Sequence, residues 1–260
     1  MKINVSLLYT EGTNCNLETE NAFRKVGASV ETKILSEIIR NNENFDKSHI
    51  IVIPGGFSYG DDISAGKVFA DLLMHYERDN INRFLNNGKL IIGICNGFQV
   101  LVKSGLLPNI DGNENVEVTL DFNDSGIFIN KWVNLKVNNN SVSKFINHNF
   151  PDTIELPIAH AEGKFVANKR IIKSLNENRQ IVFQYCDKDG NITDKSNPNG
   201  SYSNIAGICD ISGQILGLMP HPERYVEIYQ YPSWQRKQFS SDSMGTLIFN
   251  NAIKYVKENL

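Results

Sequence analysis

The sequence predicts an α/β protein with a mostly parallel β-sheet, helices on both faces of that sheet and added β-hairpins. Two observations support this fold class. Strand-like and helix-like segments alternate through the first hundred residues, as in parallel sheets whose strands are joined by crossover helices. The run HIIVI at residues 49–53 is continuously apolar, which is typical of a strand buried on both faces. In such sheets, active sites form beyond the carboxyl ends of the strands.

Local signals place four strands and three helices in the first half of the chain. The expected strands are residues 3–9, 29–35, 49–53 and 89–94, and the expected helices are residues 17–26, 61–76 and 98–103. In the first helix, Ala22, Phe23 and Val26 recur at helical spacing and Gly27 provides a stop. The second helix carries a similar apolar stripe, and the third follows a glycine-flanked cysteine.

The second half of the chain has a different character. Hairpins are expected at residues 116–137, around Asn-Asp-Ser-Gly, and at residues 208–219, with a turn at Ser-Gly. From Ser243 onward the apolar residues follow the spacing of an amphipathic helix. The sequence contains no repeat, linker or low-complexity tract, so residues 1–260 are expected to form a single domain.

Composition excludes several classes of function. The chain is 41% hydrophobic and 21% charged, with a net charge of −3 and no basic tract, which argues against nucleic acid or an anionic membrane as the main partner. No segment resembles a signal peptide or reaches the roughly 18 apolar residues of a membrane span. The four cysteines lack C-x-x-C spacing and are expected to be free thiols in a cytoplasmic protein.

The stretch Gly93-Ile94-Cys95-Asn96-Gly97 places a cysteine where a buried strand turns into a helix. A nucleophile elbow has this pattern, because small residues on either side of the nucleophile let the backbones pack closely. The following helix supplies unpaired N–H groups and the positive end of its dipole, which favours a thiolate at Cys95 and offers the Asn96 N–H to an oxyanion. Cys95 is therefore a candidate nucleophile. The alternative is a buried core cysteine near a helix start.

A cysteine nucleophile needs a base and a group that orients the base. Of the five histidines, His221 in LMPHPER is the candidate base. Because Pro222 disfavours helical geometry for the residue before it, we expect His221-Pro222-Glu223 to be extended, with His221 and Glu223 on the same side. Glu223 would then fix the tautomer of the imidazole. The alternative is a turn residue with a solvated carboxylate.

The segment PGGFSYGD, directly after the apolar run 49–53, provides a candidate oxyanion loop. Consecutive glycines let backbone N–H groups turn towards a ligand, so one donor from Gly55 or Gly56 and one from Asn96 would form an oxyanion hole. A phosphate-binding loop is excluded, because GDDISAGK at residues 60–67 has one residue too many and is followed by valine.

Other polar residues give weaker signals. His160 and Glu162, in LPIAHAEGKF, follow an apolar run and could line a pocket from a polar loop. The sequence has none of the Cys and His clusters that a metal site needs. We therefore expect no catalytic metal in this chain.

Seven motifs in chain order resemble a family of class I, triad-type glutamine amidotransferases, whose fold is flavodoxin-like. The family is that of the glutaminase components of phosphoribosylformylglycinamidine synthase, an enzyme of purine biosynthesis, and the motifs span residues 11–224. They are EGTNCNLE at Glu11, GGFSYGD at Gly55, GICNGFQ at Gly93, LPIAHAEGKF at Leu156, NPNGS at Asn197, IAGI at Ile205 and MPHPER at Met219.

The resemblance implies roles for seven residues. They are Cys95 as nucleophile, His221 as general base and acid, Glu223 as its orienting partner, Gly55, Gly56 and Asn96 as oxyanion donors, and Gln99 as a contact for the substrate L-glutamine. The implied reaction forms a γ-glutamyl thioester, releases ammonia and ends in glutamate. The ammonia would pass to a separate synthetase subunit, which uses ATP and Mg²⁺ to convert formylglycinamide ribonucleotide, so no cofactor is expected in this chain. Whether a further small subunit takes part stays open.

Two other hypotheses remain. One is a stand-alone Cys-His-Glu hydrolase of γ-glutamyl amides, and the other is a non-catalytic binding module with the same fold. NPNGS and the HAEG segment argue against the stand-alone hydrolase, which has no use for a partner-specific surface. The complete set Cys95, His221 and Glu223 argues against the binding module.

Overall fold

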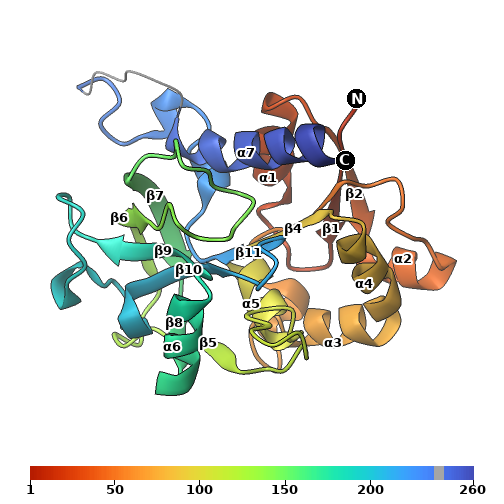
Figure 1. Cartoon of the computed structure of the whole chain (residues 1–260), viewed down its shortest axis with the longest axis horizontal. Coiled ribbons are helices and arrows are strands. Elements are labelled where there is room, and N and C mark those ends of the chain that lie inside the picture. Colours follow the sequence, from red (N-terminus) through yellow and green to blue (C-terminus); the bar gives the residue numbers. More distant parts are fainter. Residues whose placement is uncertain (237–242) are drawn as a thin grey trace.

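A nine-stranded sheet runs through the molecule (Figure 1). The computed structural model describes residues 1–236 and 243–260. The strand order is β2-β1-β3-β4-β11-β10-β9-β6-β7, in which the first five strands are mutually parallel and the rest are antiparallel. These strands are β1 (Asn4–Tyr9), β2 (Ser29–Ile34), β3 (Ile50–Ile53), β4 (Leu90–Ile94), β6 (Ile129–Val137), β7 (Thr153–His160), β9 (Ile181–Cys186), β10 (Ile205–Cys209) and β11 (Ile215–Leu218).

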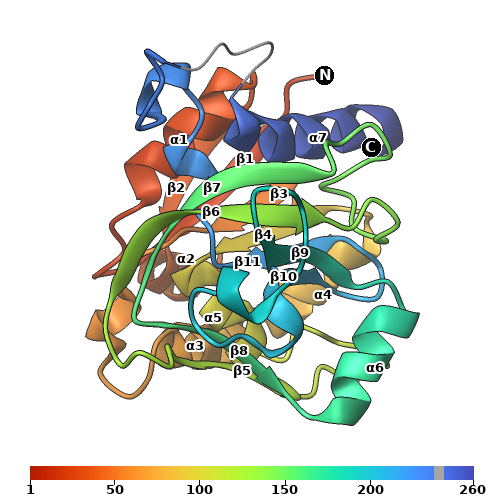
Figure 2. The same ribbon diagram turned by 90° about the vertical axis from the view of Figure 1, so that its left-hand side faces the viewer.

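Helices cover both faces of this sheet, as predicted. In Figures 1 and 2, α1 (Asn16–Lys25) and α7 (Met244–Asn259) lie on one face, and α3 (Lys67–Tyr76) and α5 (Asn96–Lys103) lie on the other. Among the described residues, the other α-helices are α2 (Leu35–Asn41), α4 (Arg78–Asn86) and α6 (Lys169–Glu177), and β5 (Val118–Phe122) and β8 (Glu162–Ala167) form a separate two-stranded sheet.

The apolar runs of the sequence form the centre of the sheet. Every residue of β3 and β4 is buried, because these strands have neighbours on both edges and helices above and below. Continuous burial explains why both strands are apolar throughout rather than alternating. The expected bounds of the first four strands agree with the structure to within about one residue.

One expected helix begins later than predicted. Residues 61–76 were expected to be helical, but α3 starts at Lys67. A short 3-10 turn, η1 (Ser58–Asp61), lies between β3 and α3. Tyr59 and Asp61 in this turn and Gly66 just before α3 have positive φ angles of 52°, 54° and 75°. A right-handed helix cannot pass through such residues, so the segment between β3 and α3 is a shaped loop.

The hairpin prediction for residues 116–137 is wrong. β5 pairs with β8, whereas β6 pairs with β7 and β9. The buried Asn123 diverts the chain, because its backbone N–H donates to Ala161 O and its side-chain amide donates to Ile127 O and His160 O. These bonds hold the turn against the β7–β8 junction. The second expected hairpin is confirmed, since β10 and β11 are antiparallel neighbours, and so is the helix after Ser243.

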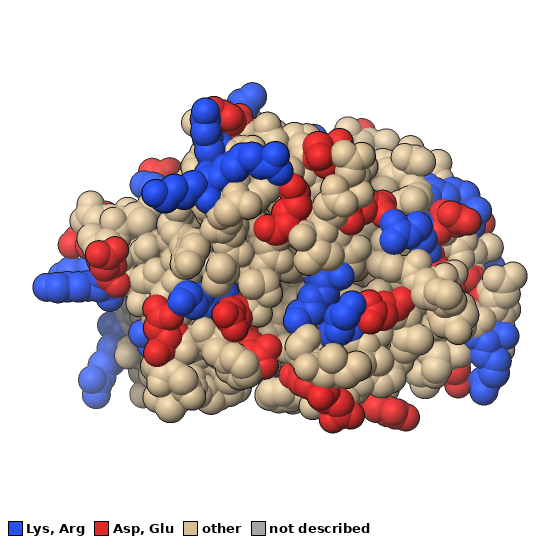
Figure 3. Space-filling view, turned by 90° about the horizontal axis from the view of Figure 1, so that it is seen from below, with Lys and Arg blue, Asp and Glu red and all other residues tan. Residues whose placement is uncertain are grey.

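One face of the molecule carries charges of both signs. In the view of Figure 3, Lys and Arg side chains are interspersed with Asp and Glu. Within residues 1–236 and 243–260, none of the helices has the length and apolar character that crossing a membrane requires.

Candidate active site

Four loops at the carboxyl ends of parallel strands meet at one place. They follow β1, β3, β4 and β11, and they carry Cys15, Gly55, Cys95 and His221. A Cβ added at Gly55 would lie 3.0 Å from both Cys15 Sγ and His221 Cε1, and 3.5 Å from Cys95 Cβ. Gly55 is therefore the point around which two thiols and an imidazole converge. The convergence follows from topology, because carboxyl ends of parallel strands share one edge of the sheet.

Cys95 lies on a strained turn between β4 and α5. Its φ and ψ angles are 52° and −104°, a region that L-residues other than glycine rarely occupy. The flanking glycines allow this turn, since a Cβ at Gly97 would lie 1.9 Å from Ile53 O and one at Gly93 would lie 2.5 Å from Gly97 O. The G-x-C-x-G pattern thus has a steric cause, and it presents Cys95 at the first turn of a helix.

Asn96 and Gln99 tie this elbow to the neighbouring loops. The Asn96 side chain accepts from Ser58 N (3.2 Å) and donates to Gln99 Oε1 (2.9 Å). Gln99 Nε2 in turn donates to Glu162 O at 2.6 Å. The network links the loop after β3, the start of α5 and the start of β8. These hydrogen bonds fix three sides of one cavity relative to one another.

His221 and Glu223 form a buried pair. Nδ1 of His221 lies 2.5 Å from Oε1 of Glu223, and the two side chains are only 2% and 0% exposed. Burial lowers the pKa of His221, but the Glu223 carboxylate and the nearby Cys95 outweigh it and raise this pKa well above its ordinary value. His221 Nε2 has no hydrogen-bond partner among the described residues. Nδ1 of the imidazole is therefore held by Glu223, whereas Nε2 is available to a substrate.

The geometry that joins this pair differs from the one expected. His221 itself is non-helical, but Pro222 and Glu223 belong to a 3-10 turn, η4 (Pro222–Arg224), rather than to an extended segment. The proline restricts only the residue before it, and its own fixed φ suits the first position of a helical turn. The expected contact forms by a different backbone path.

The Gly55-Gly56 loop packs against the loop after β1. The carbonyl of Gly55 accepts hydrogen bonds from Asn14 N (3.4 Å) and Cys15 N (3.1 Å). Because a trans peptide directs its C=O and N–H in opposite directions, the N–H of Gly56 points away from that loop. Gly56 has φ +145°, and a Cβ there would meet the backbone of Gly12 and Asn14 within 2.8 Å. Only glycine fits this position.

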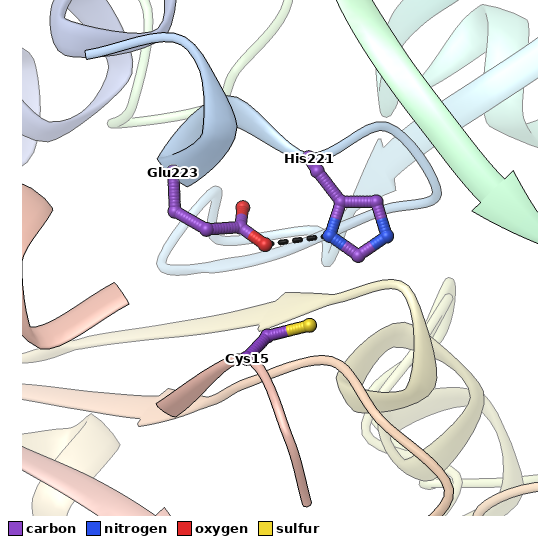
Figure 4. Close-up of side chains that lie close together, drawn as sticks. All are labelled: Cys15, His221 and Glu223. Atoms are coloured by element: carbon purple, nitrogen blue, oxygen red, sulfur yellow. Dashed lines mark hydrogen bonds and ion pairs between the residues drawn. The ribbon is translucent and has the colours of Figure 1, made fainter. Parts of the chain in front are cut away.

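Cys15 was not among the candidate site residues. Its sulfur lies 3.2 Å from Asn14 Oδ1 and 3.1 Å from Arg224 Nη2, and Arg224 also pairs with Glu18 at 2.8 Å. Burial raises the pKa of the Cys15 thiol, although His221 and Arg224 partly offset this effect. Figure 4 shows its sulfur below the imidazole of His221. Two signals in the sequence could have found it: Cys15 lies in the loop that follows the first strand, and it belongs to the motif EGTNCNLE.

His160 and Glu162 border the same cavity, as the sequence suggested, but they end β7 and begin β8 rather than occupying a loop. Asn123 fixes the tautomer of His160. The Asn123 amide nitrogen already donates to two carbonyls, so its Oδ1, 3.0 Å away, accepts from His160 Nδ1. Burial, with His221 nearby, lowers the pKa of His160 to about 3. His160 is therefore a neutral ring with an acceptor at Nε2.

The cavity has a volume of about 210 Å³, and charged groups of both signs line it. Arg224 supplies positive charge, and Asp61 and Glu162 supply carboxylates. Burial raises the pKa of both carboxyls. A small polar cavity with both signs of charge suits a zwitterionic ligand such as an amino acid.

The arrangement can support acyl transfer. It combines a thiol at a helix N-terminus, an imidazole with a free nitrogen, and a carboxylate that orients the imidazole. These are the parts of a nucleophile, a base and an orienting group. The described residues also contain one cluster that could hold a metal ion, formed by Cys15, His221 and Glu223.

Comparison with known proteins assigns the chain to a class. Residues 2–256 match the CobB/CobQ-like glutamine amidotransferase domain family, and the fold is that of class I glutamine amidotransferases. The chain is a glutamine amidotransferase.

Closer relatives define the family. The phosphoribosylformylglycinamidine synthase subunit PurQ of Methanococcus maripaludis is 41% identical, with 94% of each chain covered, and that of Dehalococcoides mccartyi is 41% identical, with 99% of each covered. A chain of the solved structure of PurLQS from Thermotoga maritima is 32% identical, with a TM-score of 0.74 and with 98% of this chain and 99% of that chain covered. The chain belongs to the PurQ family, which confirms the resemblance read from the motifs.

Proposed function

We propose that the whole chain acts as one glutaminase domain, the PurQ subunit of phosphoribosylformylglycinamidine synthase in purine biosynthesis. The observation that carries this proposal is the convergence of Cys95, His221 and Glu223 at the carboxyl edge of the sheet in a chain of this family. Family membership over nearly the full length favours this function over a stand-alone hydrolase.

The first chemical step is attack of the Cys95 thiolate on the side-chain amide carbon of glutamine. Backbone N–H groups of Asn96 and of Gly55 or Gly56 stabilise the resulting oxyanion. His221 gives a proton to the departing nitrogen, so ammonia leaves and a γ-glutamyl thioester remains on Cys95. Glu223 keeps the imidazole in place and stabilises its charged form. The 2.5 Å contact between Nδ1 and Oε1 supports that role.

The second step hydrolyses the thioester. His221 takes a proton from a water molecule, the resulting hydroxide attacks the thioester carbon, and the proton returns to the sulfur as glutamate leaves. No cofactor of this chain takes part in either step. Gln99 lines the substrate cavity, and its amide is fixed by Asn96 and by the backbone of Glu162.

The ammonia goes to a separate synthetase subunit, PurL, which uses ATP and Mg²⁺ to convert formylglycinamide ribonucleotide to formylglycinamidine ribonucleotide. The PurLQS relative supports a complex of this kind. We propose that this complex also includes a third, small subunit. We place the reaction in the cytoplasm, since all four cysteines are free and free thiols persist in a reducing compartment.

A titration tests the proposed function. The purified chain is mixed with increasing synthetase subunit in the presence of ATP, Mg²⁺ and formylglycinamide ribonucleotide, and glutamate release is followed. We expect weak hydrolysis by the isolated chain and a rise on addition of the partner and its substrates, because docking completes the oxyanion loop and couples glutamine use to acceptor supply. A rate that none of these additions changes would favour an ordinary hydrolase.

A further inference from the structure

Cys15 has no role in the proposed mechanism, although it lies beside His221 and Glu223. One ligand atom from each of Cys15, His221 and Glu223 lies within 4.8 Å of the other two. The three residues are buried, with exposures of 1%, 1% and 0%. Figure 4 shows the Cys15 sulfur directed towards the pair from the opposite wall. The cluster therefore joins the loop after β1 to the turn after β11.

The donor set matches one class of cation. A thiolate, an imidazole and a carboxylate are ligands of zinc and similar borderline-soft divalent ions, whereas magnesium prefers oxygen ligands and bound water. A second observation points the same way: Oε2 of Glu223 is buried and has no hydrogen-bond partner among the described residues. An unsatisfied buried carboxylate oxygen is costly, and a bound cation would satisfy it.

We propose that Cys15, His221 and Glu223 form an inhibitory site for a borderline-soft divalent metal ion, with Zn²⁺ as its probe. The ion binds the Cys15 sulfur, Nδ1 of His221 and a carboxylate oxygen of Glu223. It replaces the proton between Nδ1 and Glu223, and the neutral ring keeps its proton on Nε2. At zinc–ligand distances of about 2.0–2.3 Å in tetrahedral geometry, two ligand atoms lie roughly 3.3–3.7 Å apart. Nδ1 of His221 and Oε1 of Glu223, 2.5 Å apart, must therefore separate by about 1 Å, and the Cys15 sulfur must approach them from within 4.8 Å.

The surrounding charges balance such an ion. Arg224 lies beside the cluster, with Nη2 3.1 Å from the Cys15 sulfur, and its Nε donates to Glu18. With metal bound, the site carries three negative charges, on the Cys15 thiolate, Glu223 and Glu18. They equal the three positive charges of the divalent ion and Arg224. On metal binding, the sulfur exchanges its contact with Arg224 for a bond to the ion and releases its proton to solvent.

Metal at this site stops catalysis without touching Cys95. The ion occupies the nitrogen that Glu223 orients, so His221 loses the partner that positions it and stabilises its charged form. This inhibitory effect rests on the proposed function. Binding of the ion does not, and it can be measured on protein that hydrolyses nothing.

The test is zinc binding to chelator-treated full-length chain, measured by competition with a chromophoric chelator. Wild type and the remote control Cys209→Ala should bind one ion per chain with the same affinity. The Cys95→Ala chain should bind equally well, whereas Cys15→Ala should bind at least tenfold more weakly. With Co²⁺ in place of Zn²⁺, a thiolate-to-cobalt absorption band should appear in the Cys95→Ala chain and be absent from Cys15→Ala.

Two results would overturn the site. One is unchanged zinc affinity in Cys15→Ala, and the other is its loss in Cys95→Ala, which would place the ion on the opposite side of His221. If Cys15→Ala fails to fold by circular dichroism, Cys15→Ser takes its place, since a hydroxyl is a poor zinc ligand and nearly the same size. Zinc should inhibit wild-type glutamine hydrolysis at the concentration at which it binds, and a chelator should reverse the inhibition. Binding without any glutaminase activity would count against the proposed function and leave the metal site standing.

Discussion

Gly97 packs so closely on Ile53 that a Cβ at position 97 would lie 1.9 Å from the Ile53 carbonyl oxygen. Ile53 ends β3, and Gly97 lies in the first turn of α5. This backbone contact sets the distance between the elbow at Cys95 and the glycine loop that follows β3. The spacing of the proposed nucleophile and oxyanion donors thus depends on the absence of one methyl group.

Gly97→Ala should lower both stability and activity. Overpacking of this kind typically costs about 1–3 kcal/mol, and backbone atoms leave little room for relief here. We expect a loss at the upper end of that range in urea unfolding, with little glutamine hydrolysis left. Gly126→Ala is the control, because φ is +65° but a Cβ there would meet nothing within 4 Å; it should cost about 1 kcal/mol. Equal losses in the two variants would contradict the packing argument.

Cys95→Ala should abolish glutamine hydrolysis and preserve the fold. The side chain supplies the proposed nucleophile, and the contact of its sulfur with Ala159 O is long, at 3.8 Å. Thermal unfolding should stay near the wild-type temperature while glutamate release falls to background. Substantial residual turnover would show that another group attacks the substrate.

His221→Ala should be nearly as damaging as loss of the nucleophile, because both proton transfers pass through the imidazole. General acid–base groups typically contribute about 10²–10⁴-fold. Glu223→Gln should cost less, since it changes the partner of Nδ1 without removing the base. Steady-state kcat and KM for glutamine distinguish the two variants, and a larger loss of kcat in Glu223→Gln than in His221→Ala would reverse the assigned roles.

His160 should make the fold sensitive to acid. Its pKa is about 3 in the folded chain and about 6.5 in an unfolded one. The unfolded chain therefore binds a proton that the folded chain excludes, and stability falls as pH decreases from about 6.5 towards 3.

Between pH 7 and pH 5 this residue alone should remove about 2 kcal/mol. His160→Gln keeps a donor for Asn123 but does not titrate, so urea unfolding at the two pH values should show a smaller loss in the variant. Equal losses in both proteins would mean that His160 is protonated at little cost.

The parallel half of the fold could be predicted because its signals are local. Continuous apolar runs such as 49–53 report burial on both faces, and glycine stops report helix ends. Strand pairing in the antiparallel half is a long-range property. The turn at Asn123 looks like a hairpin in sequence, but its side chain bonds to residues nearly forty positions away and separates β5 from β6.

The convergence of the candidate residues and the omission of Cys15 have related physical reasons. Strand ends converge by topology, so candidates after β3, β4 and β11 were certain to become neighbours once the sheet formed. Cys15 follows β1 and joins them in the same way, but a single cysteine has no spacing pattern of its own. Its nearness to His221 arises only from the folded arrangement of four loops.

The most direct test of the account is covalent labelling with the glutamine analogue diazo-oxo-norleucine, followed by peptide mass mapping. All four cysteines are free, so each could react. Burial raises the pKa of Cys15, that of Cys186 to about 11 and that of Cys209 to about 12, which leaves these sulfurs protonated near neutral pH. We expect one label per chain, on Cys95, and none on Cys95→Ala. A label on Cys15 with Cys95 unmodified would contradict it.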